Sequence, residues 1–302
     1  MTKKNTQKPH VDVHDRITSK IIKCIEDGAG ELTMPWHSAG VSLENPENVD
    51  TKNHYRGINV LSLWGDAMVK GFGSSTWGTY RQWQKQGCQV RKGETASVVV
   101  VYKNVQAKGA SSKDKDAKKG MYFLAKAASV FNAEQVDGYE APAPEQEPVS
   151  RVERLMQVET FVAATGADVR HGGASAHYNS ATDSVHMPEV ERFIGSGTST
   201  ATEAYYGVLL HELTHWTKTK TRCDRPSPLE FEKEAYATEE LVAELGAAFL
   251  CADLGVTQEP RADHAQYVEH WLKVFKGDNR AIFKAAAQAS KAAEFLRGLQ
   301  HA

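Results

Sequence analysis

The segment His211-Glu212-Leu213-Thr214-His215 combines residue types that hold and use a metal ion. On an α-helix, positions i and i+4 lie on one face about 5–6 Å apart, so both histidines can offer a nitrogen to one ion. Imidazole nitrogens bind Zn²⁺ at about 2.0–2.1 Å. Glu212 lies one residue further around the turn, where its carboxylate can take a proton from a water on the ion. The spacing predicts a zinc-dependent metallopeptidase site with ligands His211 and His215 and catalytic base Glu212.

A third ligand is expected on the acidic segment FEKEAYATEELVAELGAAFL, because a catalytic zinc normally has three protein ligands and one open position. Glu240 and Glu244 are four residues apart and flank Leu241, so they share a face of a predicted helix. We assign Glu240 as the third ligand. Glu244 is expected to orient a ligand imidazole by accepting a hydrogen bond from the ring nitrogen that does not bind the metal. Glu244 and Glu239 are the alternative ligands.

The segment Ala176–Met187 is predicted to form a hairpin that turns at Thr182-Asp183. One interpretation is that it supplies the edge strand of a metallopeptidase cleft, which binds a peptide by strand addition. The alternative is an ordinary surface hairpin, and the sequence does not separate the two.

Periodicity of the apolar residues predicts an α+β fold with two domains: a mixed N-terminal part and a mainly helical C-terminal part with a small β-sheet. One helix is expected to be capped by Ser75 or Thr76 and to end at Gly87. The other predicted helices are 13–26, 59–69, 152–165, 201–218, 231–254 and two near the C-terminus, and the predicted strands of the N-terminal part are 97–103 and 122–130.

Composition supports this division of the 302 residues. The Pro- and Glu-rich stretch 138–150 is predicted to be a linker between domains 1–137 and 151–302, and the Lys-rich stretch 106–120 a mobile loop of the first domain. The four cysteines are far apart, which argues against a disulfide framework and a thiolate zinc site. No apolar run approaches the length of a membrane span, so no membrane partner and a cytoplasmic location are expected.

The formal net charge of −2 conceals two halves of opposite charge. Residues 1–140 hold 20 Lys and Arg against 15 Asp and Glu, whereas residues 141–302 hold 16 against 23. Aromatic residues beside cations are typical of single-stranded nucleic-acid binding. Trp64 and Trp77 are expected in the core. The candidate DNA-contacting residues are Trp36, Tyr55, Arg56, Arg81, Arg91, Lys92 and Lys103.

Seven segments, in order, resemble the ArdC-type antirestriction proteins of conjugative plasmids and other mobile elements. They are YRGIN from Tyr55, STWGTYRQW ending at Trp83, GCQVRKGE from Gly87, VFNAEQVDG from Val130, AHYNSATDSVHMP from Ala176, YYGVLLHELTHWT from Tyr205 and EELVAELGAAFL from Glu239.

The resemblance implies an N-terminal domain that binds single-stranded DNA and a C-terminal zincin-like metallopeptidase domain. It implies protection of incoming plasmid DNA from host restriction during conjugation. It also implies ligands His211, His215 and Glu240 with Glu212 as base, and the run from Glu240 to Glu244 resembles the second metal motif of gluzincin-type peptidases.

We therefore expect an antirestriction protein with two partners, single-stranded DNA and an unidentified protein or peptide substrate. It would hold one Zn²⁺ per chain, other divalent metals being possible. One alternative is a pure single-stranded DNA shield whose metal site is structural or vestigial. Another is a plasmid-encoded regulatory protease.

Overall fold

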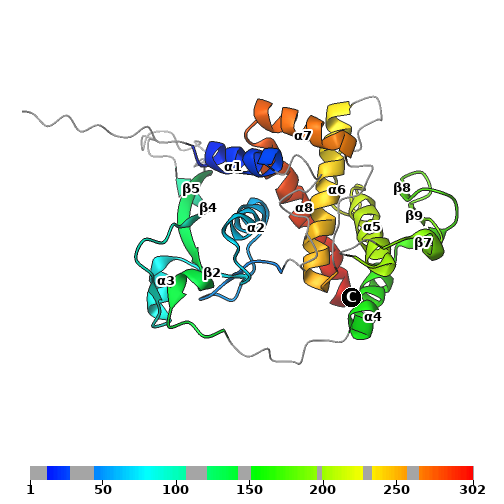
Figure 1. Ribbon diagram of the computed structural model, residues 1–302. Helices are drawn as coiled ribbons and strands as arrows, with labels where there is room; N and C mark the ends of the chain where they lie inside the picture. The colour runs from blue at the N-terminus through cyan, green and yellow to red at the C-terminus, as the bar shows by residue number, and fades with distance from the viewer. Residues whose placement is uncertain are drawn as a thin grey trace, which may run out of the picture.

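The computed structural model describes residues 12–27, 44–106, 121–141, 151–195, 199–226, 233–256 and 265–301. Two regions form an α+β architecture, with a mixed N-terminal half and a mainly helical C-terminal half (Figure 1). Trp36 and most of the predicted Lys-rich loop and linker lie outside the described residues.

The N-terminal half is organised on a sheet with strand order β1-β2-β5-β4. The long strands β4 and β5 pair antiparallel, from Ser97 opposite Val130 to Gln106 opposite Met121. A two-stranded sheet of β3 and β6 lies beside it. The elements are α1 (Val13–Asp27), β1 (Glu47–Asn48), α2 (Ile58–Lys70), β2 (Thr76–Gly78), α3 (Tyr80–Lys85), β3 (Gln89–Val90), β4 (Ser97–Gln106), β5 (Met121–Asn132), the 3-10 turn η1 (Ala133–Gln135) and β6 (Val136–Asp137).

The prediction that Ser75 or Thr76 caps a helix is wrong. Residues 76–78 form strand β2, which pairs with both β1 and β5, and the buried Trp77 belongs to that strand. The helix begins at Tyr80, because Thr79 makes a capping box with Gln82: its hydroxyl accepts from the Gln82 amide at 3.3 Å, and the Gln82 side chain accepts from the Thr79 amide at 2.8 Å.

Helix α2 covers the outer edge of the sheet. In the described part of the chain β4 pairs with β5 alone, so its other edge would expose backbone groups. The Asn59 side chain donates to the Val100 carbonyl at 2.9 Å and accepts from the Val100 amide at 2.7 Å. The Ser62 hydroxyl donates to the Val98 carbonyl at 2.8 Å. These bonds attach the helix to the strand.

The C-terminal half surrounds helices α5 and α6 with α4, α7, α8 and a small sheet of order β7-β9-β8. The predicted hairpin is confirmed, since β8 and β9 pair antiparallel across Asp183, whose φ is 52°. Strand β7, parallel to β9, was not predicted. The elements are α4 (Arg151–Ala164), β7 (Asp168–His171), β8 (His177–Asn179), β9 (Ser184–Met187), η2 (Val190–Arg192), α5 (Ala201–Trp216), α6 (Lys233–Leu254), α7 (Ala265–Gly277), α8 (Ala281–Gly298) and η4 (Leu299–His301).

The two halves share a hydrophobic core. Figure 1 shows α1 and α2 between the N-terminal sheet and the helices α6 and α8. The buried residues of α1 and α2, Ile17 and Leu61 among them, belong to the same apolar cluster as Phe249 of α6 and Ala286 of α8. Gly57, at φ 56°, donates its amide to the Ser290 hydroxyl at 2.8 Å. None of the described helices is both long and apolar enough to cross a lipid bilayer.

Candidate metal centre

Helix α5 places three chemically active side chains in the interior. Thr200 begins the helix with a capping box: its hydroxyl accepts from the Glu203 amide, and the Glu203 carboxylate accepts from the Thr200 amide at 2.9 Å. His211, Glu212 and His215 follow on the buried helix, with exposed fractions of 1%, 3% and 7%. These three side chains therefore do not lie on a solvated face of the helix.

Glu240 on α6 faces both imidazoles. Its Oε2 lies 3.5 Å from the Nε2 of His211, and its Oε1 lies 3.4 Å from the Nε2 of His215. One potential ligand atom from each of the three residues lies within 4.8 Å of the other two. Ligands at about 2.0–2.1 Å from a tetrahedral ion stand about 3.4 Å apart, so the Glu240 distances fit a divalent cation. The structure thus brings the three predicted ligands together.

Behind His215 lies a buried ion pair. The Nδ1 of His215, the ring nitrogen that does not face Glu240, is 3.2 Å from Oε1 of Glu239. Arg225 donates to both oxygens of that carboxylate, at 2.9 and 3.1 Å. Arg225 also donates to the Thr214 carbonyl at 2.8 Å and to the Thr217 hydroxyl at 2.7 Å. It therefore joins the end of α5 to α6 and fixes the orientation of His215.

Glu244 lies behind the other histidine. Its Oε2 is 3.6 Å from the Nδ1 of His211, and its side chain is fully buried. This is the position that a ligand-orienting carboxylate would take. Glu239, an alternative ligand in the sequence analysis, occupies the corresponding position behind His215.

The carboxylates control the protonation of the site. Burial alone would lower the pKa of His215, but hydrogen bonds to Glu239 and Glu240 outweigh it and raise that pKa to about 9. Burial opposes ionisation of Glu240, yet the two imidazoles hold its pKa far below the ordinary value. A cation would replace the proton that these groups share.

The hairpin is fastened to the end of the same helix. Arg222 donates to both carboxylate oxygens of Asp183 at the hairpin turn, at 2.9 and 2.5 Å, and to the Trp216 carbonyl at 2.7 Å. Its guanidinium stacks on the Trp216 ring at 3.5 Å. The hairpin thus has a fixed relation to α5, and its role as the edge strand of a peptide cleft stays one of two interpretations.

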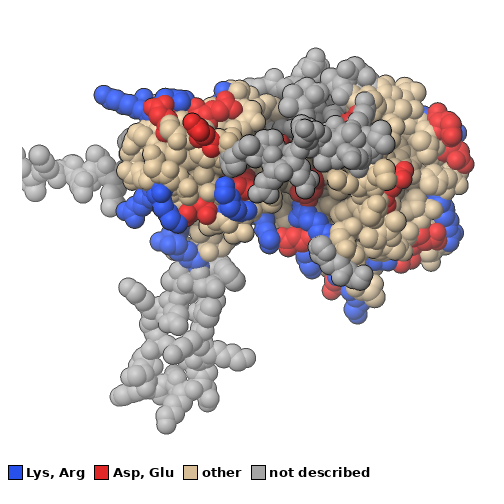
Figure 2. Space-filling model, turned by 90° about the horizontal axis from the view of Figure 1, so that it is seen from below, with Lys and Arg blue, Asp and Glu red and all other residues tan. Residues whose placement is uncertain are grey.

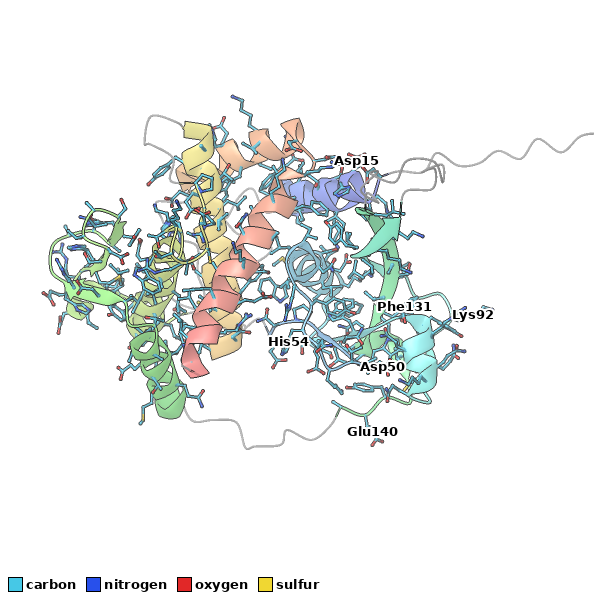
Figure 3. The ribbon with its side chains drawn as sticks, turned by 180° about the vertical axis from the view of Figure 1, so that it is seen from behind. Asp15, Asp50, His54, Lys92, Phe131 and Glu140 are labelled. Carbon is cyan, nitrogen blue, oxygen red and sulfur yellow. The ribbon has the colours of Figure 1, made fainter. Side chains whose placement is uncertain are left out.

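The candidate DNA-contacting residues do not form one cluster. Tyr55 and Arg56 lie at the junction of the two halves, where Arg56 pairs with Glu294 of α8 at 2.8 Å. Figure 3 shows Lys92 at the opposite edge of the N-terminal half. Figure 2 shows Lys and Arg side chains on the N-terminal half and again, mixed with acids, where the halves meet. Arg81 and Lys103 are exposed on α3 and β4, and Arg91 is held by Glu94 at 3.1 Å.

Sequence reasoning missed Arg225 and the role of Glu239. Arg225 lies in the loop between α5 and α6, where no helical or strand periodicity marks a buried position. The available signal was indirect: three buried glutamates on one helix require a compensating cation.

Comparison with known proteins gives two family matches. Residues 11–131 match the N-terminal domain of anti-restriction factor ArdC, and residues 156–288 match a zincin-like metallopeptidase domain. The chain is 41% identical to the Sinorhizobium fredii protein y4eC, covering 99% of this chain and 96% of that protein. It is 34% identical to a DNA primase TraC of Escherichia coli, covering 94% of this chain but 27% of the primase.

Two solved structures are similar over nearly the whole chain. They are the metal-free and the Mn(II)-bound crystal structures of the antirestriction protein ArdC from plasmid R388. The metal-free structure superposes with a TM-score of 0.78 at 37% identity, covering 96% of this chain and 98% of that one. The Mn(II)-bound structure gives 0.76 at 38% identity, with the same coverage. Together with the zincin-like domain, the Mn(II)-bound form indicates a divalent metal site.

Proposed function

Because the chain belongs to the family of ArdC antirestriction proteins, we propose that it binds single-stranded DNA and carries an active metallopeptidase site. It would protect DNA entering a bacterial cytoplasm from host restriction. The main support for a peptidase site is the position of the Glu240 carboxylate, 3.4–3.5 Å from the imidazoles of His211 and His215. Glu212, the proposed base, is buried on the same helix as these histidines.

In this proposal His211, His215 and Glu240 hold the cation, and zinc is the ion we expect. When bound, the ion supplies Lewis-acid activation of a water and of the scissile carbonyl. Glu212 accepts the proton of the attacking water and delivers it to the leaving amine. Glu239 and Glu244 keep the two imidazoles oriented, and the exclusion of solvent by α6 strengthens these interactions.

The metal assignment is tested by metal analysis of His215→Ala against the unaltered protein. We expect near-stoichiometric zinc in the unaltered protein and loss of it in the variant. His177→Ala is the matched control, because His177 is exposed on β8 and is not among the clustered donors. An unchanged zinc content in His215→Ala would refute the assignment of His215 as a metal ligand.

The catalytic role is tested by Glu212→Gln, which removes the base and leaves the three proposed ligands in place. Peptide hydrolysis should fall by at least a hundredfold while zinc content is retained. If protection of incoming DNA survives the substitution, a DNA shield explains antirestriction better than proteolysis does.

DNA binding is measured on the full chain, because α1 and α2 share their core with α6 and α8. We expect a labelled single-stranded oligonucleotide to bind, and binding to weaken steeply with salt. No binding at low salt would favour the regulatory-protease alternative.

A further inference from the structure

A pocket of about 620 Å³ lies where the N-terminal half meets the C-terminal helices. Residues 52–56 form one wall, and residues of α4, α6, α8 and η4 form the other; Figure 3 shows His54 on the side of the N-terminal half that faces α8. Phe249 and Asp253 in this wall follow Glu240 on α6 by nine and thirteen residues. At 1.5 Å per residue they lie roughly 14 and 20 Å further along the helix. The pocket is therefore separate from the metal centre.

Three benzene-type rings, from Tyr55, Phe161 and Phe249, are among the residues that line the pocket. Phe249 and Phe161 are buried and contribute apolar surface from the C-terminal half. Tyr55 is half-buried and closes the pocket from the N-terminal half, with its hydroxyl held by the Asn48 amide at 3.0 Å. Such rings offer flat surface to an unpaired base of any sequence.

Cations lie at the rim of the same pocket. Arg56 is 74% exposed and pairs with Glu294, itself 41% exposed, and Lys52 is 57% exposed at 3.5 Å from Glu47. Exposed pairs of this kind are weak, so both cations can exchange a carboxylate partner for a phosphate. Arg297 also lines the pocket and is paired with Asp253.

We propose that this junction pocket takes one nucleotide unit of single-stranded DNA, with its base against Tyr55 and its phosphate at Lys52 and Arg56. The proposal rests on the DNA binding proposed above. It adds the place at which the DNA strand enters the space between the two halves. Pockets of about 300–1,000 Å³ accommodate ligands of nucleotide size. A nucleotide held there contacts α6, the helix that carries Glu240, and the N-terminal half at once.

The first test compares Lys52→Gln/Arg56→Gln in the full chain with the unaltered protein. Anisotropy of a fluorescein-labelled oligothymidylate should report at least tenfold weaker binding. The slope of log K against log salt should shrink by about 1.4, for two phosphate contacts to a single strand. Lys276→Gln/Lys284→Gln is the matched control: both lysines are exposed, both are in ion pairs, and neither lines the pocket.

A second pair of variants tests the base contact. Tyr55→Phe keeps the ring and should bind the oligothymidylate like the unaltered protein, whereas Tyr55→Leu should bind about five- to a hundredfold more weakly. A thermal melt and the zinc content of each variant report whether the fold is retained. Equal affinity of a folded Tyr55→Leu would overturn the base contact.

The outcomes separate this proposal from the one on which it rests. If the unaltered protein binds the oligonucleotide and Lys52→Gln/Arg56→Gln has the same affinity and salt slope, the strand lies elsewhere and only the pocket assignment fails. If the unaltered protein does not bind, both proposals fail. Free thymidine monophosphate should compete only at far higher nucleotide concentration. Micromolar binding of it that depends on Lys52 and Arg56 would assign the pocket to a free nucleotide and overturn its assignment to a strand.

Discussion

Gly246 of α6 lies so close to Thr214 of α5 that a Cβ atom at residue 246 would stand 2.5 Å from the Cγ2 of Thr214. The two helices therefore cross at a separation that only glycine permits at this position. Thr214 precedes the ligand candidate His215, and Gly246 follows Glu240 by six residues. The crossing consequently sets the distance between the imidazoles and the carboxylate.

Gly246→Ala is expected to force α5 and α6 apart. Overpacking of this kind costs about 1–3 kcal/mol in the free energy of unfolding, and zinc affinity should fall with it because the Glu240 distances lengthen. Urea denaturation of the metal-free protein and a competitive zinc titration measure the two effects.

Two further variants isolate the contact. Gly207→Ala on α5 has open space around its new methyl group and should gain up to about 1 kcal/mol from helix propensity. Adding Thr214→Ala to Gly246→Ala removes the opposing Cγ2 and should restore part of the zinc affinity. If the double variant binds zinc no more tightly than Gly246→Ala, the contact with the Thr214 Cγ2 is not the cause of the loss.

Arg225→Met should destabilise the protein by about 3–5 kcal/mol, since it leaves the buried carboxylate of Glu239 without its guanidinium partner. Loss of the group that holds Glu239 should also weaken zinc binding by about 10- to 100-fold. Chemical denaturation and zinc titration are again the measurements. Arg225→Met/Glu239→Gln removes both charges and should be more stable than Arg225→Met alone. A double variant less stable than Arg225→Met would show that the Arg225 and Glu239 charges do not compensate each other.

Stability of the metal-free protein should decrease with rising pH above neutrality. The pKa of His215 is raised from about 6.5 to about 9 in the folded state. The folded protein thus holds an extra proton between these values, and the stability this provides is complete below about pH 6.5 and lost as the pH passes 9.

We expect a difference on the order of 1–3 kcal/mol between pH 6.5 and 9.5, measured by urea denaturation after chelation of metal. Glu239 and Glu240 have lowered pKa values and titrate below this window. His215→Gln should abolish the His215 contribution. Zinc affinity should show the opposite trend and rise with pH, because the ion displaces the proton. An identical pH profile for the variant would refute the assignment to His215.

The part of the site that sequence could predict is the part encoded by local spacing. The four-residue interval between His211 and His215 fixes a common helix face, and the interval between Glu240 and Glu244 does the same on α6. The first interval predicted the pairing of the two imidazoles, and the second narrowed the third ligand to the acidic face of α6. Glu240 was preferred there over Glu239 and Glu244, and in the structure it is the carboxylate that lies 3.4–3.5 Å from both imidazoles.

The part that sequence could not predict depends on tertiary contacts. Arg225 comes from a loop, and its role exists only because Glu239 of another element faces His215. Strand β2 was predicted as part of a helix because a buried Trp77 is compatible with both helical and strand periodicity. Only the pairing of residues 76–78 with β1 and β5 shows that they form a strand. No local pattern indicates that Arg56 pairs with Glu294, which lies 238 positions later in the chain. The contact of Arg56 with DNA stays a prediction.

Asn59→Asp tests whether α2 protects the edge of the N-terminal sheet. The native amide donates to the Val100 carbonyl and accepts from the Val100 amide, whereas a carboxylate can only accept. The Val100 carbonyl would then lose its partner and face a negative charge, which should cost about 1–3 kcal/mol in the free energy of unfolding. Asn53→Asp introduces the same charge at an exposed position nearby and should change stability by less than about 0.5 kcal/mol.

Because the bare edge of β4 can pair with another chain, Asn59→Asp should also associate at high concentration, detectable by light scattering. A monomeric variant of unchanged stability would mean that the edge is protected by other groups.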